Sequence, residues 1–125
     1  MADEKPRKPL FWVGSCKDDL SDFPEEVKSV MGYALHLAQI GTKHPHAKPL
    51  KRFGGAGVLD VVEDHEGDTC RAMYTVRFAG AVYALHAFQE KSKRGIETPR
   101  KELELVRSRL KAAEDDHAKR AKDEA

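Results

Sequence analysis

Residues 58–89 read VLDVVEDHEGDTCRAMYTVRFAGAVYALHAFQ, and this stretch decides the fold. It contains three segments rich in β-branched and aromatic residues, at 58–63, 70–78 and 81–89. The joints between them, Glu66-Gly67-Asp68 and Ala79-Gly80, are short enough for antiparallel hairpins. The stretch therefore predicts a three-stranded antiparallel meander.

Alternation along the middle segment predicts which of its faces is core, because successive side chains of a strand point to opposite faces. The face predicted to be core carries Cys70, Ala72, Tyr74, Val76 and Phe78. The face predicted to lie outside the core carries Arg71, Met73, Thr75 and Arg77. Both faces of the third segment are apolar, which is typical of a strand inside a sheet. One of them carries Val82, Ala84 and Phe88, and the other carries Tyr83, Leu85 and Ala87.

Elements are also predicted before the meander. Residues 9–14 are short and aromatic, and they predict an N-terminal strand. A helix is predicted from Pro24, whose fixed φ suits a first helical turn, to Gly41. Its apolar residues recur at helical spacing: Val27, Val30, Met31, Ala34 and Ala38. Residues 42–57 are interrupted by prolines and glycines, so they are predicted to be a loop.

A C-terminal helix is predicted after the meander. Thr98 supplies an N-cap and Pro99 the first helical position. The apolar stripe of this helix is Leu103, Val106 and Leu110. The sequence thus predicts an α+β fold, in which a small antiparallel sheet (N-terminal strand plus meander) is packed by N-terminal helices and a C-terminal helix.

Length and composition favour a single domain in 125 residues, of which 40% are hydrophobic and 34% charged. We expect a flexible N-terminus at 1–8, one domain at 9–111 and a charged helical extension or tail at 112–125. The chain contains neither an apolar run of membrane-spanning length nor a signal-peptide pattern, so we expect a cytoplasmic protein without membrane contact. Cys16 and Cys70 are far apart and are expected to be free thiols.

The net charge of +1 conceals three charged segments. Residues 43–52 carry four basic residues and no acidic one, and residues 60–68 carry five acidic residues and no basic one. Residues 91–111 carry eight basic residues against three acidic ones, a net charge of +5. If the fold brings the two basic segments together, they form a site for a polyanion such as nucleic acid. The alternative is a solvated surface of mixed charge.

Other chemistry has little support in the residues. The chain has no Gly-x-Ser-x-Gly turn and no phosphate-binding glycine loop between a strand and a helix. His44 and His46 lack a third ligand nearby in the sequence, and His86 is a lone strand histidine. What remains is a set of basic residues that sheet geometry could collect: Lys51, Arg52, Arg71, Arg77, Lys91, Lys93 and Arg94. Such a cluster suits metal-free RNA cleavage, and a protein that only binds an anionic partner has the same pattern.

Three segments resemble phage-derived Gp49-like proteins, which are HigB-type toxins of the RelE/ParE superfamily. They are KPLKRFGG at 48–55, RAMYTVR at 71–77 and LHAFQEKSK at 85–93, the last followed by Gly95, Thr98 and Pro99. The resemblance covers roughly residues 9–111 and implies a RelE-like fold. It also implies the toxin of a type II toxin–antitoxin system, commonly an endoribonuclease (mRNA interferase) that cuts mRNA on the ribosome and so inhibits translation and growth.

Site residues follow from this resemblance by position. Arg71, Lys91 and Lys93 are expected to be catalytic, and Arg71 is similar to the strand arginine that binds phosphate in the family. RNA phosphate is expected to be bound by Lys51, Arg52, Arg77 and Arg94. No metal or other cofactor is implied. Three positions depart from the family pattern: Glu90 replaces a usual lysine, Arg52 a frequent glycine and Cys70 a common aromatic residue.

The expected partners are mRNA, the ribosome and a cognate antitoxin of helix-turn-helix type, with operator DNA contacted only through the antitoxin complex. Two alternatives stay open. One is a ParE-like toxin that inhibits DNA gyrase by binding protein, and the other is a catalytically silent phage-derived binding module. The outer face of the helix at 98–111 could contact ribosomal RNA, receive an acidic antitoxin segment or be merely solvated.

Overall fold

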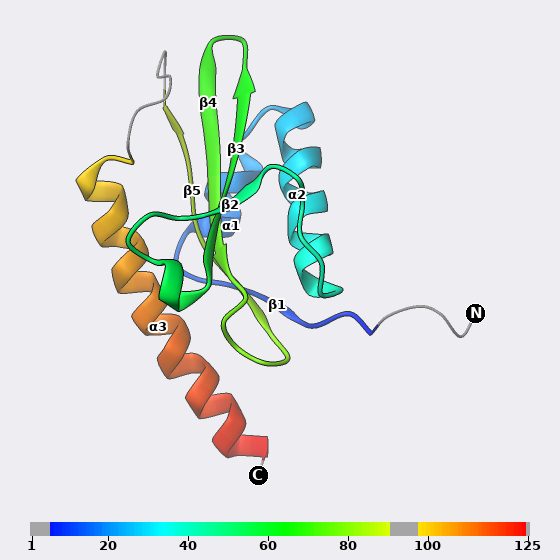
Figure 1. The fold of residues 1–125 in the computed structure, drawn as a ribbon, viewed down its shortest axis with the longest axis vertical. Coiled ribbons are helices and arrows are strands. Elements are labelled where there is room, and N and C mark those ends of the chain that lie inside the picture. Colours follow the sequence, from blue (N-terminus) through cyan, green and yellow to red (C-terminus); the bar gives the residue numbers. More distant parts are fainter. Residues whose placement is uncertain (1–5, 91–97, 125) are drawn as a thin grey trace.

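The computed structural model describes residues 6–90 and 98–124, and these contain a five-stranded sheet (Figure 1). The strands are β1 Leu10–Trp12, β2 Ala47–Pro49, β3 Val58–His65, β4 Asp68–Thr75 and β5 Val82–Glu90. Their order across the sheet is β1-β5-β4-β3-β2. All neighbouring pairs are antiparallel except β1 and β5, which are parallel, so the sheet is mixed. The predicted α+β class and the predicted meander of β3, β4 and β5 are confirmed.

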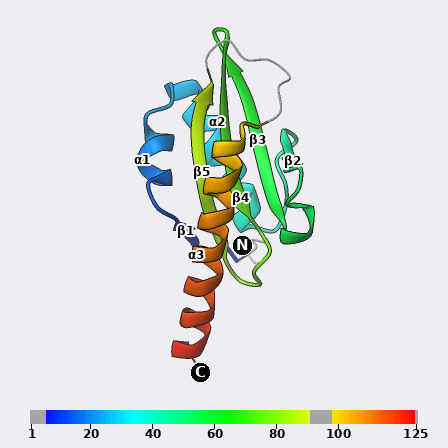
Figure 2. The same ribbon diagram turned by 90° about the vertical axis from the view of Figure 1, so that its left-hand side faces the viewer.

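Helices cover both faces of this sheet. They are α1 Cys16–Ser21, α2 Glu25–Gln39 and α3 Arg100–Glu124, with a single 3-10 turn, η1, at Gly54–Ala56. Figures 1 and 2 show α1 and α2 on one face and α3 running across the other. None of the helices in the described part of the chain is both long and apolar enough to cross a bilayer.

The β3–β4 hairpin has the tight turn that its sequence predicts. His65 and Asp68 are the last paired residues, and only Glu66 and Gly67 lie between them. Both turn residues have positive φ, 51° for Glu66 and 88° for Gly67. Two positive φ angles in succession match the right-handed twist of the flanking strands, and glycine adopts them without strain.

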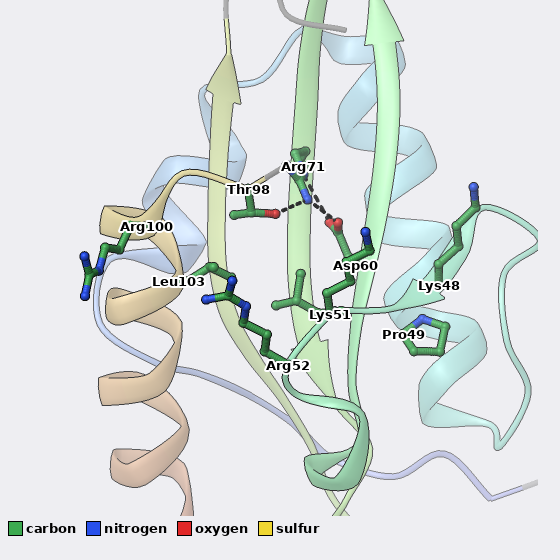
Figure 3. A pocket seen from close by; sticks show the side chains of 10 residues that line it. Lys48, Pro49, Lys51, Arg52, Asp60, Arg71, Thr98, Arg100 and Leu103 are labelled. Carbon is green, nitrogen blue, oxygen red and sulfur yellow. Dashed lines mark hydrogen bonds and ion pairs between the residues drawn. The ribbon is translucent and has the colours of Figure 1, made fainter. Parts of the chain in front are cut away.

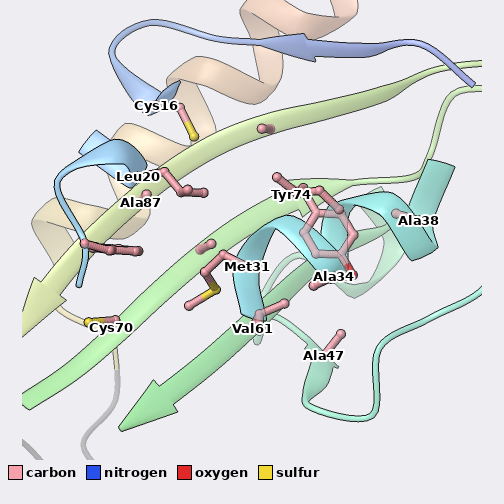
Figure 4. Packing of buried hydrophobic residues seen from close by; sticks show 14 of the residues in the cluster. Cys16, Leu20, Met31, Ala34, Ala38, Ala47, Val61, Cys70, Tyr74 and Ala87 are labelled. Atoms are coloured by element: carbon pink, nitrogen blue, oxygen red, sulfur yellow. The ribbon is translucent and has the colours of Figure 1, made fainter. Parts of the chain in front are cut away.

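The prediction of one core face on β4 is wrong, because helices pack on both faces. Ala72 and Tyr74 belong to a core cluster beneath α1 and α2, which Figure 4 shows with Met31. Met73 belongs to a second cluster beneath α3. Arg71 points to this second face and is also buried, with 7% of its surface exposed. The strand ends at Thr75, so the predicted alternation does not extend to the residues that follow it.

The alternation predicted for β5 is wrong beyond Leu85, because the strand contains a bulge. Met73 pairs with His86, but Tyr74 pairs with Ala84, which leaves Leu85 as the extra residue. A bulge lets two successive side chains point to the same face. Residues after the bulge therefore exchange faces relative to the prediction: Ala87 joins the cluster of α1 and α2, and Phe88 packs against the cluster of α3.

The segment predicted as a loop at 42–57 contains two short elements, β2 and η1. β2 is an edge strand that pairs with β3, and its Lys48 lies opposite Asp60. An edge strand tolerates Pro49 because one side of its backbone needs no ladder hydrogen bonds. Three residues, the last of them a proline, give too short a pattern for a sequence-based strand prediction. Their position brings basic residues of this segment to the sheet.

α3 continues well beyond Lys111. Ala113 is fully buried, and Asp116 accepts a hydrogen bond of 2.7 Å from the Tyr83 hydroxyl. Further along, His117 stacks on Phe78 at 4.6 Å between ring centroids. The charged segment after 111 is thus helical in the described residues, and part of it packs on the sheet.

Candidate phosphate-binding site

A cavity of about 660 Å³ lies where three parts of the chain meet (Figure 3). The segment from Lys48 to Arg52 forms one wall, and the start of α3 forms the opposite wall with Thr98, Arg100 and Leu103. Strands β3 and β4 form the floor through Asp60 and Arg71. The fold therefore brings together two segments that are far apart in the sequence and rich in basic residues.

The lining of this cavity is strongly cationic. Five basic side chains take part, namely Lys48, Lys51, Arg52, Arg71 and Arg100. Asp60 is the single carboxylate among the described lining residues. Lys51, Arg52 and Arg100 are exposed at the rim, whereas Arg71 and Asp60 are buried at the floor. An anion of the size of a phosphodiester would meet an excess of positive charge here.

Arg71 is held by several partners at the floor. Its Nη2 donates to Asp60 Oδ2 at 2.5 Å and to the Thr98 hydroxyl oxygen at 2.5 Å. Nη1 lies 3.6 Å from Glu90 Oε1, and the guanidinium carbon lies 5.6 Å from the centre of the Phe88 ring. The side chain is thereby fixed in orientation, and two carboxylates already compensate its charge.

Burial raises the pKa of the Asp60 carboxyl above its ordinary value. The hydrogen bond and charge of Arg71 act in the opposite direction, as does the charge of Lys48. Desolvation of a carboxylate in a site that opens onto a cavity favours the protonated form and makes the ionised form a better proton acceptor.

Arg52 has an unusual backbone for an arginine. Its φ is 75°, in the left-handed region that favours glycine. The conformation follows from the sharp turn between β2 and η1, and it directs the chain so that Lys51 and Arg52 both line the cavity. An arginine at this position carries a backbone strain that glycine would avoid.

The structure brings together three of the predicted site residues, Lys51, Arg52 and Arg71. Arg77 does not join them, because β4 ends at Thr75 and Arg77 forms an ion pair with Glu114 of α3 instead. Glu114 is 14 residues after Arg100 in α3, so at ~1.5 Å per residue the two positions are about 21 Å apart along the helix axis. Arg77, which pairs with Glu114, is therefore far from the start of α3 that lines the cavity.

The three predicted residues Lys91, Lys93 and Arg94 lie outside the described residues. Sequence reasoning missed Asp60 and Thr98 as partners of Arg71, and it did not single out Arg100. The sequence does contain a signal for Asp60. The register of the β3–β4 hairpin puts this acidic residue on the same face of the sheet as Arg71. Thr98 and Arg100 reach the cavity through the packing of α3, which the sequence does not specify.

The histidines do not take part in this cavity. His86 is buried beneath α3, where its Nε2 lies 2.6 Å from Glu102 Oε1 and its Nδ1 3.4 Å from Arg109 Nη1. The pKa of His44 is lowered by burial and by neighbouring His46, whose Nδ1 lies 3.0 Å from Glu63. Within residues 6–90 and 98–124, no three histidine, cysteine, aspartate or glutamate side chains are grouped so that they could hold a metal ion.

Comparison with known proteins gives one family and one solved structure. The sequence model of the family described as phage derived protein Gp49-like matches residues 18–111. A chain in the crystal structure of the toxin–antitoxin complex RelBE2 from Mycobacterium tuberculosis is similar in structure, with 18% sequence identity and a TM-score of 0.42. The alignment covers 73% of this chain and 99% of that chain. None of the curated proteins matches the sequence.

Proposed function

Because this chain belongs to the phage-derived Gp49-like family, we propose that it is the toxin of a type II toxin–antitoxin system. Its activity is that of a RelE-like endoribonuclease, which cleaves mRNA on the ribosome without a metal ion and so inhibits translation and growth. The observation that carries this proposal is the cationic cavity with Arg71 at its floor and Lys51, Arg52 and Arg100 at its rim.

The cavity supports binding of a phosphodiester. Lys51 and Arg52 approach it from one wall. Arg100 belongs to the other wall, where its exposed guanidinium points away from the cavity and its Nε lies 3.4 Å from Glu104 Oε2, so a change of rotamer would bring it to an RNA phosphate from the second side. A further cation, Arg107 of α3, lies close to this wall of the cavity. Its guanidinium carbon is 5.0 Å from the centre of the ring of Phe53, the residue that follows Arg52. An RNA strand that enters the cavity would also meet this cation.

Cleavage requires that the 2′-hydroxyl lose its proton, that the charge on the in-line phosphorane be stabilised and that the 5′ oxygen be protonated. Guanidinium and ammonium groups suit the second requirement, because they bring fixed positive charge to the equatorial oxygens. We assign this role to Lys51, Arg52 and Arg100, with Arg71 beneath them. Lys91 and Lys93 remain proposed catalytic residues on the basis of the family resemblance alone, and Arg94 a proposed phosphate ligand.

One observation favours a second candidate, a binding module without catalytic activity. Arg71 is already bonded to Asp60 and Thr98, and Glu90 lies 3.6 Å from it. A phosphate must compete with two carboxylates for this guanidinium, which reduces the affinity that Arg71 can contribute. In the nuclease, Arg71 would act by holding the floor of the site together while the rim cations bind the phosphate.

We further propose that the toxin acts in the cytoplasm, where its mRNA substrate and the ribosome are found, and that a cognate antitoxin of helix-turn-helix type neutralises it. The first part of α3 offers a surface for an acidic antitoxin segment, because its exposed charged residues up to Lys111 are Arg100, Lys101, Glu104, Arg107 and Lys111, a basic excess. Operator DNA would be contacted only through the antitoxin complex.

Induced expression in bacteria tests the proposed function. Growth is followed after induction, and mRNA 5′ ends are mapped in the same cells. Growth arrest with new 5′ ends at ribosome-determined positions is expected. Growth arrest without new ends would indicate a protein target such as gyrase. Normal growth with well-folded, soluble toxin would favour the silent binding module.

A further inference from the structure

Asp60 occupies an unusual place for a carboxylate. Its side chain is 9% exposed, it lines the floor of the cavity, and the rim above it is formed by exposed cations. A phosphodiester bound to the rim cations would lie above this carboxylate. The cavity therefore contains an acceptor group for the proton that cleavage must remove.

The two oxygens of Asp60 are used unequally. Oδ2 accepts the hydrogen bond of 2.5 Å from Arg71 Nη2, whereas Oδ1 lies 3.5 Å from Arg71 Nε, at the limit of a hydrogen bond. Arg71 thus orients the carboxylate through Oδ2 and leaves Oδ1 able to accept a second hydrogen bond. A ribose hydroxyl in the cavity would be a suitable donor.

Charged groups face Asp60 from every side of the cavity. Arg71 on β4 and Lys48 on β2 are cationic neighbours that lower its pKa, and Glu90 on β5 approaches the same guanidinium from the other side. The rim adds the cations of the 51–52 segment and Arg100 of α3. Burial outweighs these cations and raises the pKa of the carboxyl above its ordinary value.

We propose that Asp60 is the general base of RNA cleavage, an inference that rests on the proposed nuclease function. The ribose 2′-O–H bond breaks and its proton moves to Asp60 Oδ1, while the 2′ oxygen forms a bond to phosphorus. The bond from phosphorus to the 5′ oxygen breaks, and this oxygen takes a proton from solvent. The products are a 2′,3′-cyclic phosphate and a 5′-hydroxyl end.

Other groups at the site are less suited to this role. Ammonium and guanidinium groups carry no acceptor lone pair, so the rim cations and Arg71 do not serve as bases while charged. Glu90 also approaches Arg71, but it is not among the described residues that line the cavity. Asp60 is the described carboxylate with access to bound substrate.

The test is single-turnover cleavage of a defined mRNA on purified ribosomes, measured from about pH 4 to 8 with the full-length chain. The variants are Asp60→Asn, Asp60→Glu and a matched control, Asp64→Asn. Asp64 lies on the same strand and the same face of the sheet as Asp60, is bonded to Thr69 and does not line the cavity. Circular dichroism and a urea transition establish that each variant is folded.

A general base contributes about 10²- to 10⁴-fold to a rate, so Asp60→Asn should lose at least about 100-fold. The wild-type rate should rise with pH through the pKa of Asp60 and then level off, and Asp60→Asn should lack this rise. Asp60→Glu should recover the rise and part of the rate, and Asp64→Asn should match the wild type. All four proteins should bind an mRNA with a 2′-deoxy residue at the cut site equally well.

Two results would overturn the inference. One is a wild-type chain that cleaves while Asp60→Asn cleaves with the same rate or keeps the same pH-dependent rise. The other is weaker binding of the 2′-deoxy mRNA by Asp60→Asn that accounts for its whole loss of rate, which would make Asp60 a positioning residue. A wild-type chain that does not cleave at any pH would instead contradict the proposed function itself.

Discussion

Arg71 and Asp60 form a buried ion pair across the β3–β4 hairpin, although they are not opposite each other in its register. Arg71 lies opposite Val62, and Asp60 lies opposite Met73, so the pair is diagonal. Its nitrogen and oxygen are 2.5 Å apart, and each side chain is only 9% exposed. Both residues line the cavity, and both lie on interior strands of the sheet. Substitutions of either residue should therefore also change the stability of the fold.

Replacement of Arg71 by alanine should therefore destabilise the protein, because it leaves Asp60 buried without its partner. Removing one member of a buried ion pair costs about 3–5 kcal/mol, a large part of the stability of a domain of this size. Removing both members should cost less than the sum of the single changes. Urea unfolding of Arg71→Ala, Asp60→Ala and the double variant measures this coupling, and additive effects would show that the pair is not an energetic unit.

The raised pKa of Asp60 predicts a pH dependence of stability with a definite sign. Between the ordinary carboxyl pKa and the raised folded-state pKa, the folded chain binds more protons than the unfolded chain. The free energy of unfolding should then fall as pH rises through this window, and this component should be missing in Asp60→Asn. Urea unfolding of both proteins from about pH 4 upward gives the difference, and a difference that stays constant would contradict the assignment.

Arg52→Gly should change stability and RNA binding in opposite directions. The left-handed backbone at Arg52 costs a non-glycine residue about 1–2 kcal/mol, so glycine should raise the free energy of unfolding by up to about that amount. The same change removes a rim cation and should weaken RNA binding and reduce its salt dependence. Urea unfolding and salt-dependent RNA binding are the two measurements. A less stable variant would show that the arginine side chain stabilises this turn.

The contact between His86 of β5 and Glu102 of α3 joins these two elements. We therefore expect its removal to lower the free energy of unfolding. Glu102→Ala leaves the buried His86 Nε2 without its partner, which lies 2.6 Å away in the native chain. The expected loss is about 1–3 kcal/mol, the range for an unsatisfied buried polar group. Urea unfolding measures it, with Glu104→Ala as the exposed control on the same helix. Equal stability of the two variants would show that the contact is dispensable.

The sequence was sufficient to predict the meander, the α+β class and the helix of α2, because hydrophobic periodicity and turn residues carry this information locally. It also identified Lys51, Arg52 and Arg71, which the fold brings to one cavity. The bulge at Leu85 could not be predicted, because an extra residue in one strand depends on the pairing with β4. This extra residue is the reason that Ala87 and Phe88 lie on the opposite faces of β5 from those predicted.

The burial of Arg71 was missed for a different reason. An arginine in an alternating strand normally indicates a solvated face, but here the start of α3 with Thr98 packs across that face, and Asp60, Phe88 and Glu90 also surround the side chain. The same packing brings Arg100 to the cavity, whereas the early end of β4 separates Arg77 from it. Such long-range docking depends on tertiary contacts, so a local sequence pattern does not specify it.

The claim that the cationic cavity is the nuclease site is tested most directly by single-turnover mRNA cleavage on purified ribosomes with two matched double variants. Lys51→Ala with Arg100→Ala removes one cation from each wall of the cavity. Lys17→Ala with Lys28→Ala removes two cations on α1 and α2, across the sheet. Charged hydrogen bonds contribute about 1.5–3 kcal/mol each, so the cavity variant should lose at least about 100-fold in rate. The control should stay within about twofold of the wild type, and a cavity variant as active as the control would contradict the assignment.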